Sequence, residues 1–248
     1  MSALKAEFRK LLTVRSTYIV CALTLALLIF YGFYIAGWRI DSADLLNKGT
    51  LAGDITGAAS TVSIFVALLA VLLMTHEYRY NTIMYTLTSS NSRNKVLFAK
   101  VVAMTVFAIA FIAVAAVLAP LMVLWGIHAH SLTLVPQTLH IGTLIWECLF
   151  YCWGYTMAGL LLAALIRNQI GAIVTLFIVP GTVEALLGLL LKNNAQYLPF
   201  TALGIVVGNS MHAITSPISA GRAALVFTGY LVVGWIIAWI LFLQRDAN

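Results

Sequence analysis

Residues 55–75 read ITGAASTVSIFVALLAVLLMT and contain no charged side chain. A helix needs roughly 20 consecutive apolar residues to cross a bilayer core about 30 Å thick, and this stretch is long enough to do so. The rest of the chain has the same character, since 62% of its 248 residues are hydrophobic, 9% are charged and the mean hydropathy is +1.00. No soluble domain can bury that much apolar surface. The composition therefore predicts an integral membrane protein.

Six stretches of the chain have the length and apolar character of a membrane span. They are residues 16–38, 55–75, 96–126, 141–166, 169–191 and 223–243. Little sequence remains for a soluble domain, and no linker or repeat divides the chain, so we predict an all-α fold with a single transmembrane domain over residues 1–248. The first stretch follows a basic region, as in a signal peptide, but it is too long and lacks a small-residue cleavage site. We therefore expect it to be a retained span.

The basic residues are distributed unevenly between the two sides that six spans define. If the N-terminus is cytoplasmic, ten Lys and Arg residues fall on that side and four on the other. The cytoplasmic group is Lys5, Arg9, Lys10, Arg15, Arg79, Arg93, Lys95, Lys100, Arg167 and Arg245, and the outer group is Arg39, Lys48, Lys192 and Arg222. Because short cytoplasmic loops carry an excess of Lys and Arg, we predict a multi-pass protein of the cell membrane with both termini in the cytoplasm.

Two segments outside the spans have the apolar spacing of amphipathic helices. In residues 1–15, apolar residues fall on one helical face and Lys5, Arg9 and Lys10 on another. We expect this helix to lie in the cytoplasmic interface, although an ordinary positive-inside anchor would account for the same residues. Residues 77–95, EYRYNTIMYTLTSSNSRNK, join the second and third spans and have apolar side chains at i, i+3, i+4 and i+7 from Tyr80. This second segment is either a packed loop or a surface helix that a partner can dock on.

The order of sequence motifs along the first hundred residues narrows these alternatives. An amphipathic AEFRKLLTVRSTY segment and two spans are followed by an E-x-R-x-x-T stretch, an S-x-S-R stretch and a Lys that opens the next span. In this chain those letters are Glu77, Arg79, Thr82, Ser90, Ser92, Arg93 and Lys100. The arrangement resembles the type-2 family of ATP-binding-cassette (ABC) exporter permeases. The likeness in topology covers nearly the whole chain, whereas the motifs are confined to its first hundred residues.

The resemblance implies a transport subunit that works with other polypeptides. The first helix, with Glu7, Arg9 and Lys10, would be the elbow helix, and residues 77–89 would be the coupling helix docked by a cytoplasmic ATPase subunit. The coupling contacts would involve Glu77, Arg79, Asn81, Thr82 and Arg93. The family likeness also implies a dimer with a second copy or a related permease, and a short re-entrant element between spans five and six, within residues 192–222. No G-x-x-x-x-G-K-[ST] loop occurs in the chain, so we expect a permease that is not itself an enzyme, with ATP and Mg²⁺ bound by the partner ATPase.

Two carboxylates, Glu147 and Glu184, lie inside predicted spans, where an ionised group is costly. Both fall on the order of 10 Å below the outer surface at 1.5 Å per residue, and Pro180, one turn before Glu184, predicts a kink or opened turn there. We hypothesise that the two acids line the export pathway, the alternative being that each is satisfied by a neighbouring side chain. They also define a second function class, an ATP-independent channel or proton-coupled carrier.

Metal, enzymatic and nucleic-acid functions find less support in the sequence. Cys148 and Cys152 share a helix face, but a metal site would need two further ligands, so we expect packing thiols and no metal. His128, His130 and His140 lack the spacing of an H-E-x-x-H site, which weakens a membrane-embedded enzyme. The basic residues form no patch interleaved with aromatic side chains, so we expect the bilayer and protein partners, and no nucleic acid.

Overall fold

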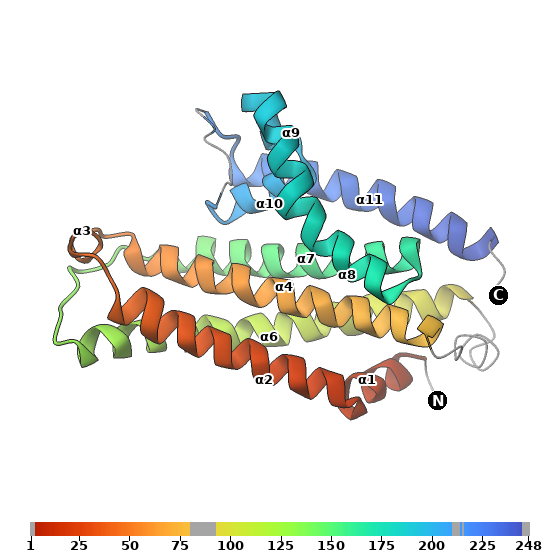
Figure 1. The fold of residues 1–248 in the computed structure, drawn as a ribbon, viewed down its shortest axis with the longest axis horizontal. Coiled ribbons are helices and arrows are strands. Elements are labelled where there is room, and N and C mark those ends of the chain that lie inside the picture. Colours follow the sequence, from red (N-terminus) through yellow and green to blue (C-terminus); the bar gives the residue numbers. More distant parts are fainter. Residues whose placement is uncertain (1–2, 80–92, 210–213, 215, 245–248) are drawn as a thin grey trace.

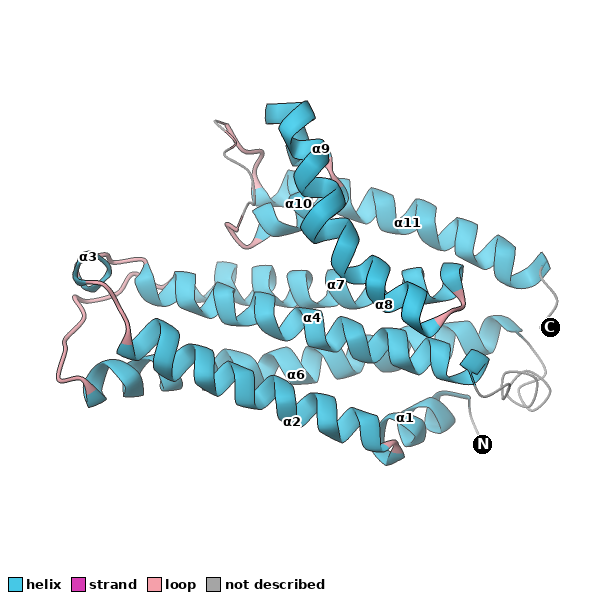
Figure 2. Cartoon of the chain, in the orientation of Figure 1, coloured by secondary structure: helices cyan, strands magenta, loops and turns pink. Residues whose placement is uncertain are grey.

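A computed structural model describes residues 3–79, 93–209, 214 and 216–244 of the chain. Over these residues the fold is all helical, without strands (Figure 2). Six helices are long and apolar enough to cross a membrane, so the prediction of six candidate spans in a multi-pass membrane protein is confirmed. Their bounds are α2 Arg15–Phe30 with η1 Tyr31–Trp38, α4 Thr50–Arg79, α6 Arg93–Ala129, α7 Ile141–Ile166, α8 Gln169–Ile178 with η2 Val179–Val183 and α9 Glu184–Leu191, and α11 Ala220–Gln244.

Helices α4 and α7 form the centre of the bundle. In an apolar window of 18 residues, 61% of the residues are buried in α4 and 67% in α7, compared with 17% in α11. Most of the buried apolar residues of α4 and α7 belong to one continuous core. Gly159 of α7 makes their close approach feasible, because a Cβ atom at this position would lie 2.7 Å from the carbonyl oxygen of Ala67 in α4. Small residues at helix contacts are the usual way for membrane helices to pack closely.

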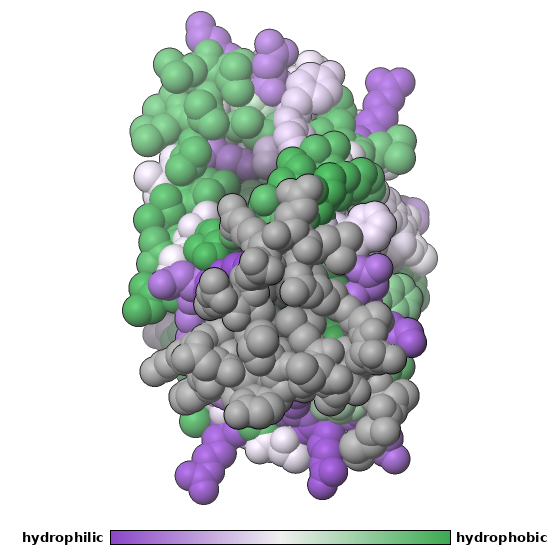
Figure 3. All heavy atoms as spheres, turned by 90° about the vertical axis from the view of Figure 1, so that its right-hand side faces the viewer, coloured by the Kyte–Doolittle hydropathy of each residue, from purple (hydrophilic) through white to green (hydrophobic). Residues whose placement is uncertain are grey.

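The two ends of the described chain lie opposite the α3 and α6–α7 connections (Figure 1). The short helix α1, Ala3–Thr13, and the last turn of α11 lie at one end, while the four-residue helix α3, Ser42–Leu45, and the α6–α7 connection lie at the other. An even number of spans produces this arrangement. Figure 3 looks onto the first of these ends and shows hydrophilic residues along its edges, beside apolar flanks.

The fifth span is interrupted in its middle. Helix α8 passes into the π-helical segment η2 at Val179, next to Pro180, and continues as α9 from Glu184. Proline has no backbone N–H and clashes with the preceding turn, and such positions are where π-bulges and kinks occur. The predicted opened turn beside Glu184 is therefore present.

Between α9 and α11 the chain folds back on the bundle. The 3₁₀ segment η3, Lys192–Tyr197, is followed by helix α10, Pro199–Val206, which packs against α11 and α7. At eight residues, α10 is far shorter than the roughly 20 residues needed for a seventh crossing. Its last six residues are all buried, so this short helix is part of the packed body of the protein.

Candidate functional site

A buried ion pair joins α1 to the start of α6. The Nζ atom of Lys100 lies 3.0 Å from Oε2 of Glu7, and each side chain is only 2% exposed. Lys10 donates from the same helix to Oε1 of Glu7 at 2.9 Å, and Lys100 also donates to the carbonyl oxygen of Leu73 in α4 at 3.4 Å. Taking a charge out of water costs several kcal/mol unless it is well paired. The pairing therefore links three helices, α1, α4 and α6, at one point.

Helix α1 brings Glu7 to this point because of how its faces are sorted. Leu11, one turn after Glu7, is buried and belongs to the main apolar core, and Phe8 packs against that core. Arg9 and Leu12 are exposed, and Lys10 is half-buried. The amphipathic helix predicted for residues 1–15 is present, but its inward face is centred on a carboxylate.

The ion pair lies close to the connection between the second and third spans. Lys100 follows Arg93, the first residue of α6, by about two helical turns or roughly 10 Å. Leu73 precedes Arg79, the last residue of α4, by a similar distance. Residues 80–92 join these two helix ends, and Lys100 connects the same two helices through its hydrogen bond to Leu73.

The predicted coupling residues are only partly within the described ranges. Glu77 and Arg79 form part of the last turn of α4, and Arg93 begins α6. Asn81 and Thr82 lie outside the described residues. The role assigned to these five residues stays a prediction.

Glu184 is satisfied by the N-terminus of α10. Its Oε1 accepts a hydrogen bond from the backbone N–H of Phe200 at 2.8 Å, and its Oε2 accepts bonds from the N–H of Thr201 at 2.7 Å and from the Thr201 hydroxyl at 2.8 Å. The first N–H groups of a helix have no partner within the helix, and the helix dipole favours a negative charge there. Glu184, which is 3% exposed, thus caps α10 from a different helix.

The two acids grouped by depth have different surroundings. Glu147 is partly exposed near the start of α7. A small cavity of about 60 Å³ lies beside Glu184, lined by Tyr151, Tyr155, Pro180, Phe200, Thr201, Gly204 and Asn209 together with Glu184 itself. Glu147 does not line it. The hypothesis that both acids line one export pathway stays a prediction.

Sequence reasoning missed the burial of Lys100 and the pairing of Glu7. Lys100 is one of the basic residues predicted for the cytoplasmic side, and the structure buries its side chain inside the bundle. The available signal was its position within the apolar stretch of residues 96–126, because a cation at such a position needs a partner. The identity of that partner, 93 residues away, left no local signal.

The cysteines and histidines form no comparable centre in the part of the chain that the structure describes. Within those ranges no three His, Cys, Asp or Glu side chains lie close enough together to hold a metal ion. Cys148 and Cys152 are both buried and belong to the main apolar core.

The chain matches the model of a known family. The model of a family described as a protein of unknown function, DUF2705, matches residues 33–247. This range covers all the spans from η1 onward and includes Lys100, whereas Glu7 precedes it. No curated protein matches the chain.

Proposed function

The chain belongs to the DUF2705 family, which is described as a protein of unknown function, and we propose that it is the permease subunit of an ABC exporter. It forms the translocation pathway and is driven by a separate ATPase subunit. The motif order along residues 6–100 suggests this class, and the buried Glu7–Lys100 pair is the observation that carries the proposal. A permease of this kind needs a stiff connection between the surface where the motor docks and the helices that move.

The ion pair provides that connection. An ATPase that displaces residues 77–93 displaces the end of α4 and the start of α6 with them, because the chain is continuous. Glu7 and Lys100 then couple α1 to the same movement, since separating two buried charges costs several kcal/mol. Closure of the ATPase pair on ATP thus rotates α1, α4 and α6 as one body and switches the pathway between its inward-facing and outward-facing states.

The proposal includes the remaining parts of the assembly. The end of the molecule with α1 faces the cytoplasm of the cell membrane, and two ATPase subunits bind ATP and Mg²⁺ there. The exposed Arg9 of the elbow helix and the coupling residues Glu77, Arg79, Asn81 and Thr82 contact them. A second permease completes the pathway, and α10 acts as the re-entrant element at its outer end.

Co-purification in mild detergent tests this proposal. The chain is tagged and expressed together with the genes that neighbour its own, and we expect a stoichiometric ATPase to remain bound. Replacing Arg79 by Glu should lower ATPase recovery several-fold, because the variant reverses a charge at the docking surface. Lys48→Glu, which reverses a charge near α3 at the opposite end, is the matched control and should retain the ATPase. Absence of any ATPase with the unaltered chain, or equal loss in both variants, would contradict the proposal.

The channel or proton-coupled carrier has less support. It uses Glu147 and Glu184 as a pair of ionisable sites, but three hydrogen bonds already hold the Glu184 carboxylate against α10. Proton flux in vesicles that lack any ATPase distinguishes this alternative. We expect none above that of empty vesicles.

A further inference from the structure

An apolar groove of about 570 Å³ lies between α6, α7 and α11. Leu97 and Phe98 contribute the α6 wall, Trp153 and Met157 the α7 floor, and Trp235 and Trp239 the α11 wall. It is separate from the Glu7–Lys100 pair, because none of the residues that form that pair lines it. Half of the six tryptophans of the chain lie in this one groove.

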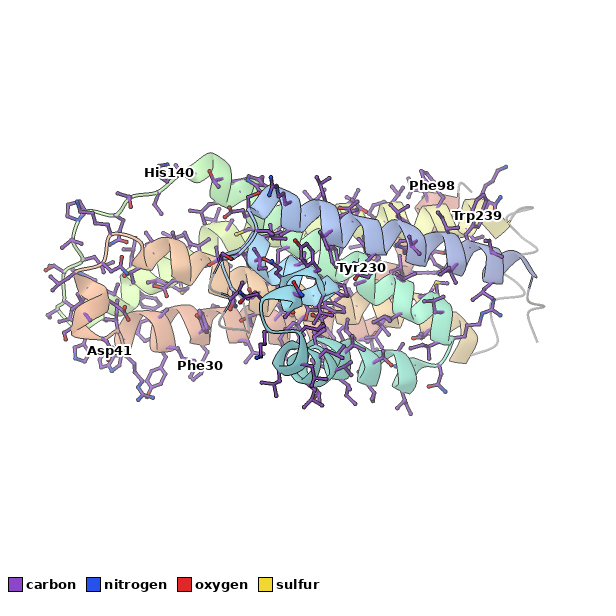
Figure 4. The ribbon with its side chains drawn as sticks, turned by 90° about the horizontal axis from the view of Figure 1, so that it is seen from above. Phe30, Asp41, Phe98, His140, Tyr230 and Trp239 are labelled. Atoms are coloured by element: carbon purple, nitrogen blue, oxygen red, sulfur yellow. The ribbon has the colours of Figure 1, made fainter. Side chains whose placement is uncertain are left out.

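The groove faces the surroundings of the bundle. Phe98 is 70% exposed and Trp239 is 47% exposed, so both walls have large apolar side chains at their rims. In Figure 4 these two labelled side chains lie near each other, toward the end of the molecule where α11 finishes, while Asp41 and His140 lie at the opposite end. In a membrane, such a groove opens sideways into the lipid.

Polar groups of the groove are concentrated at one end. The indole N–H of Trp239 donates to Oδ1 of Asn94 at 3.0 Å, and Asn94 lies one residue from the start of α6. Thr228 lies nearer the start of α11 than Trp239. Its hydroxyl donates to the backbone carbonyl of Ala224 at 2.7 Å, so this donor is not available to a ligand in the groove. A long apolar slot with one polar mouth matches the chemistry of an amphiphile. Tryptophan at such a mouth is typical of the membrane–water interface.

The charged residues next to Asn94 in the sequence indicate the kind of amphiphile. Arg93 and Lys95 flank Asn94 in the sequence, and neither α6 nor α11 contains an Asp or Glu residue. A second copy of this chain, which carries the same net charge of +6, would bring its own cations to the same membrane level. An anionic headgroup is attracted to this surface instead.

We infer that the groove binds one acyl chain of an anionic membrane phospholipid, with its phosphate beside Asn94 and the N-terminus of α6. The acyl chain lies along α11 over Trp153 and Met157. The headgroup lies at the level of the first turn of α6. This inference does not depend on the proposed transport function, and its test uses neither an ATPase nor a cargo.

Quenching of tryptophan fluorescence by brominated lipids tests the inference. Trp38, Trp125 and Trp146 are replaced by Phe, so that the emission comes from the three groove tryptophans. The protein is reconstituted in phosphatidylcholine vesicles that contain a few per cent of brominated phosphatidylglycerol or, separately, brominated phosphatidylcholine. We expect the anionic lipid to quench at a several-fold lower mole fraction than the zwitterionic lipid.

Two adjacent positions on α11 supply a matched pair of variants. Val232 lines the groove and is 52% exposed, whereas Val233 is 58% exposed and does not line it. Val232→Phe adds bulk inside the groove and should weaken the quenching by brominated phosphatidylglycerol at least fivefold. Val233→Phe adds the same bulk to the neighbouring lipid-facing surface and should leave the quenching unchanged.

Three results would overturn the inference. One is equal quenching by the two brominated lipids, which indicates general contact with the bilayer. Another is an equal effect of Val232→Phe and Val233→Phe. The third is a loss of self-association in Val232→Phe, seen by cross-linking in the same vesicles, which would assign the groove to a second copy of the chain.

Discussion

The structure stabilises two buried carboxylates, Glu7 and Glu184, in different ways. Glu7 is 2% exposed and lies beside two lysine ammonium groups, one of them at a separation of 93 residues in the sequence. Glu184 is 3% exposed and accepts bonds from the backbone and hydroxyl groups of residues 16 and 17 positions later. The first arrangement is a contact between charges on separate helices, whereas the second is a helix cap.

The two arrangements have different structural consequences. A helix cap fixes one short element, α10, against the adjacent span. A paired charge that links α1 to α6 holds only while both helices keep their positions, so it can transmit a displacement from one to the other. Variants that remove one partner at a time measure how far this distinction holds.

The largest effect is expected for Lys100→Ala. The change removes the buried partner of Glu7 and leaves the half-buried Lys10 beside it, and removing one partner of a buried ion pair costs about 3–5 kcal/mol. The free energy of unfolding, measured by titration with a denaturing detergent, should fall by about that amount. The double variant Glu7→Gln, Lys100→Met removes both charges and should recover at least half of the loss. Equal stabilities of the single and double variants would show that the charge pairing is unimportant.

Glu184→Ala should have the next largest effect. It leaves the N–H groups of Phe200 and Thr201 without their acceptor, and an unsatisfied buried donor costs about 1–3 kcal/mol. We expect a loss of about 2–4 kcal/mol in the same titration. Glu184→Gln keeps one carbonyl oxygen as an acceptor and should lose roughly half as much. If Gln and Ala variants behave alike, the capping bonds contribute little.

The membrane spans and the break in the fifth of them could be predicted from the sequence. The six candidate spans follow from composition and length alone, because each span must cover the same bilayer thickness. Pro180 predicts the interruption of the fifth span for a similarly local reason. Hydropathy and backbone chemistry act within one segment. The spans and the interruption at Pro180 could therefore be predicted from the sequence of each segment.

The partners of the buried acids could not be predicted in this way. Glu184 was grouped with Glu147 by depth, but the structure places it against α10, and nothing in residues 197–214 marks Phe200 and Thr201 as its donors. Glu7 falls in a predicted interfacial helix, and its partner Lys100 is one of the basic residues predicted for the cytoplasmic side. These contacts depend on how helices pack in three dimensions, which periodicity does not specify.

Thr201→Val sharpens the account of the cap. The variant removes the hydroxyl that donates to Oε2 of Glu184 but keeps the Thr201 backbone N–H and nearly the same side-chain volume. A hydrogen bond to a charged group contributes about 1.5–3 kcal/mol, and the remaining two bonds should limit the loss to the lower end of that range. The titration should show a loss of about 1.5 kcal/mol. In the Glu184→Gln background the same change should cost less, and equal costs in both backgrounds would show that the hydroxyl acts independently of the carboxylate.

Lys10→Ala should have the smallest effect, and it distinguishes the role of Lys10 from that of Lys100. Its side chain is 35% exposed, so water screens its attraction to Glu7, and exposed ion pairs contribute only about 0.2–1 kcal/mol. Lys10 and Glu7 also lie on the same helix, so their contact does not hold α1 to α6. We therefore expect a loss below about 1 kcal/mol, together with an unchanged distance between spin labels on Leu12 of α1 and Phe98 of α6. Lys100→Ala, in contrast, should broaden that distance distribution. Broadening in Lys10→Ala would mean that Lys10 also holds α1 in place. The link between α1 and α6 would then depend on all three charges and not only on the buried pair.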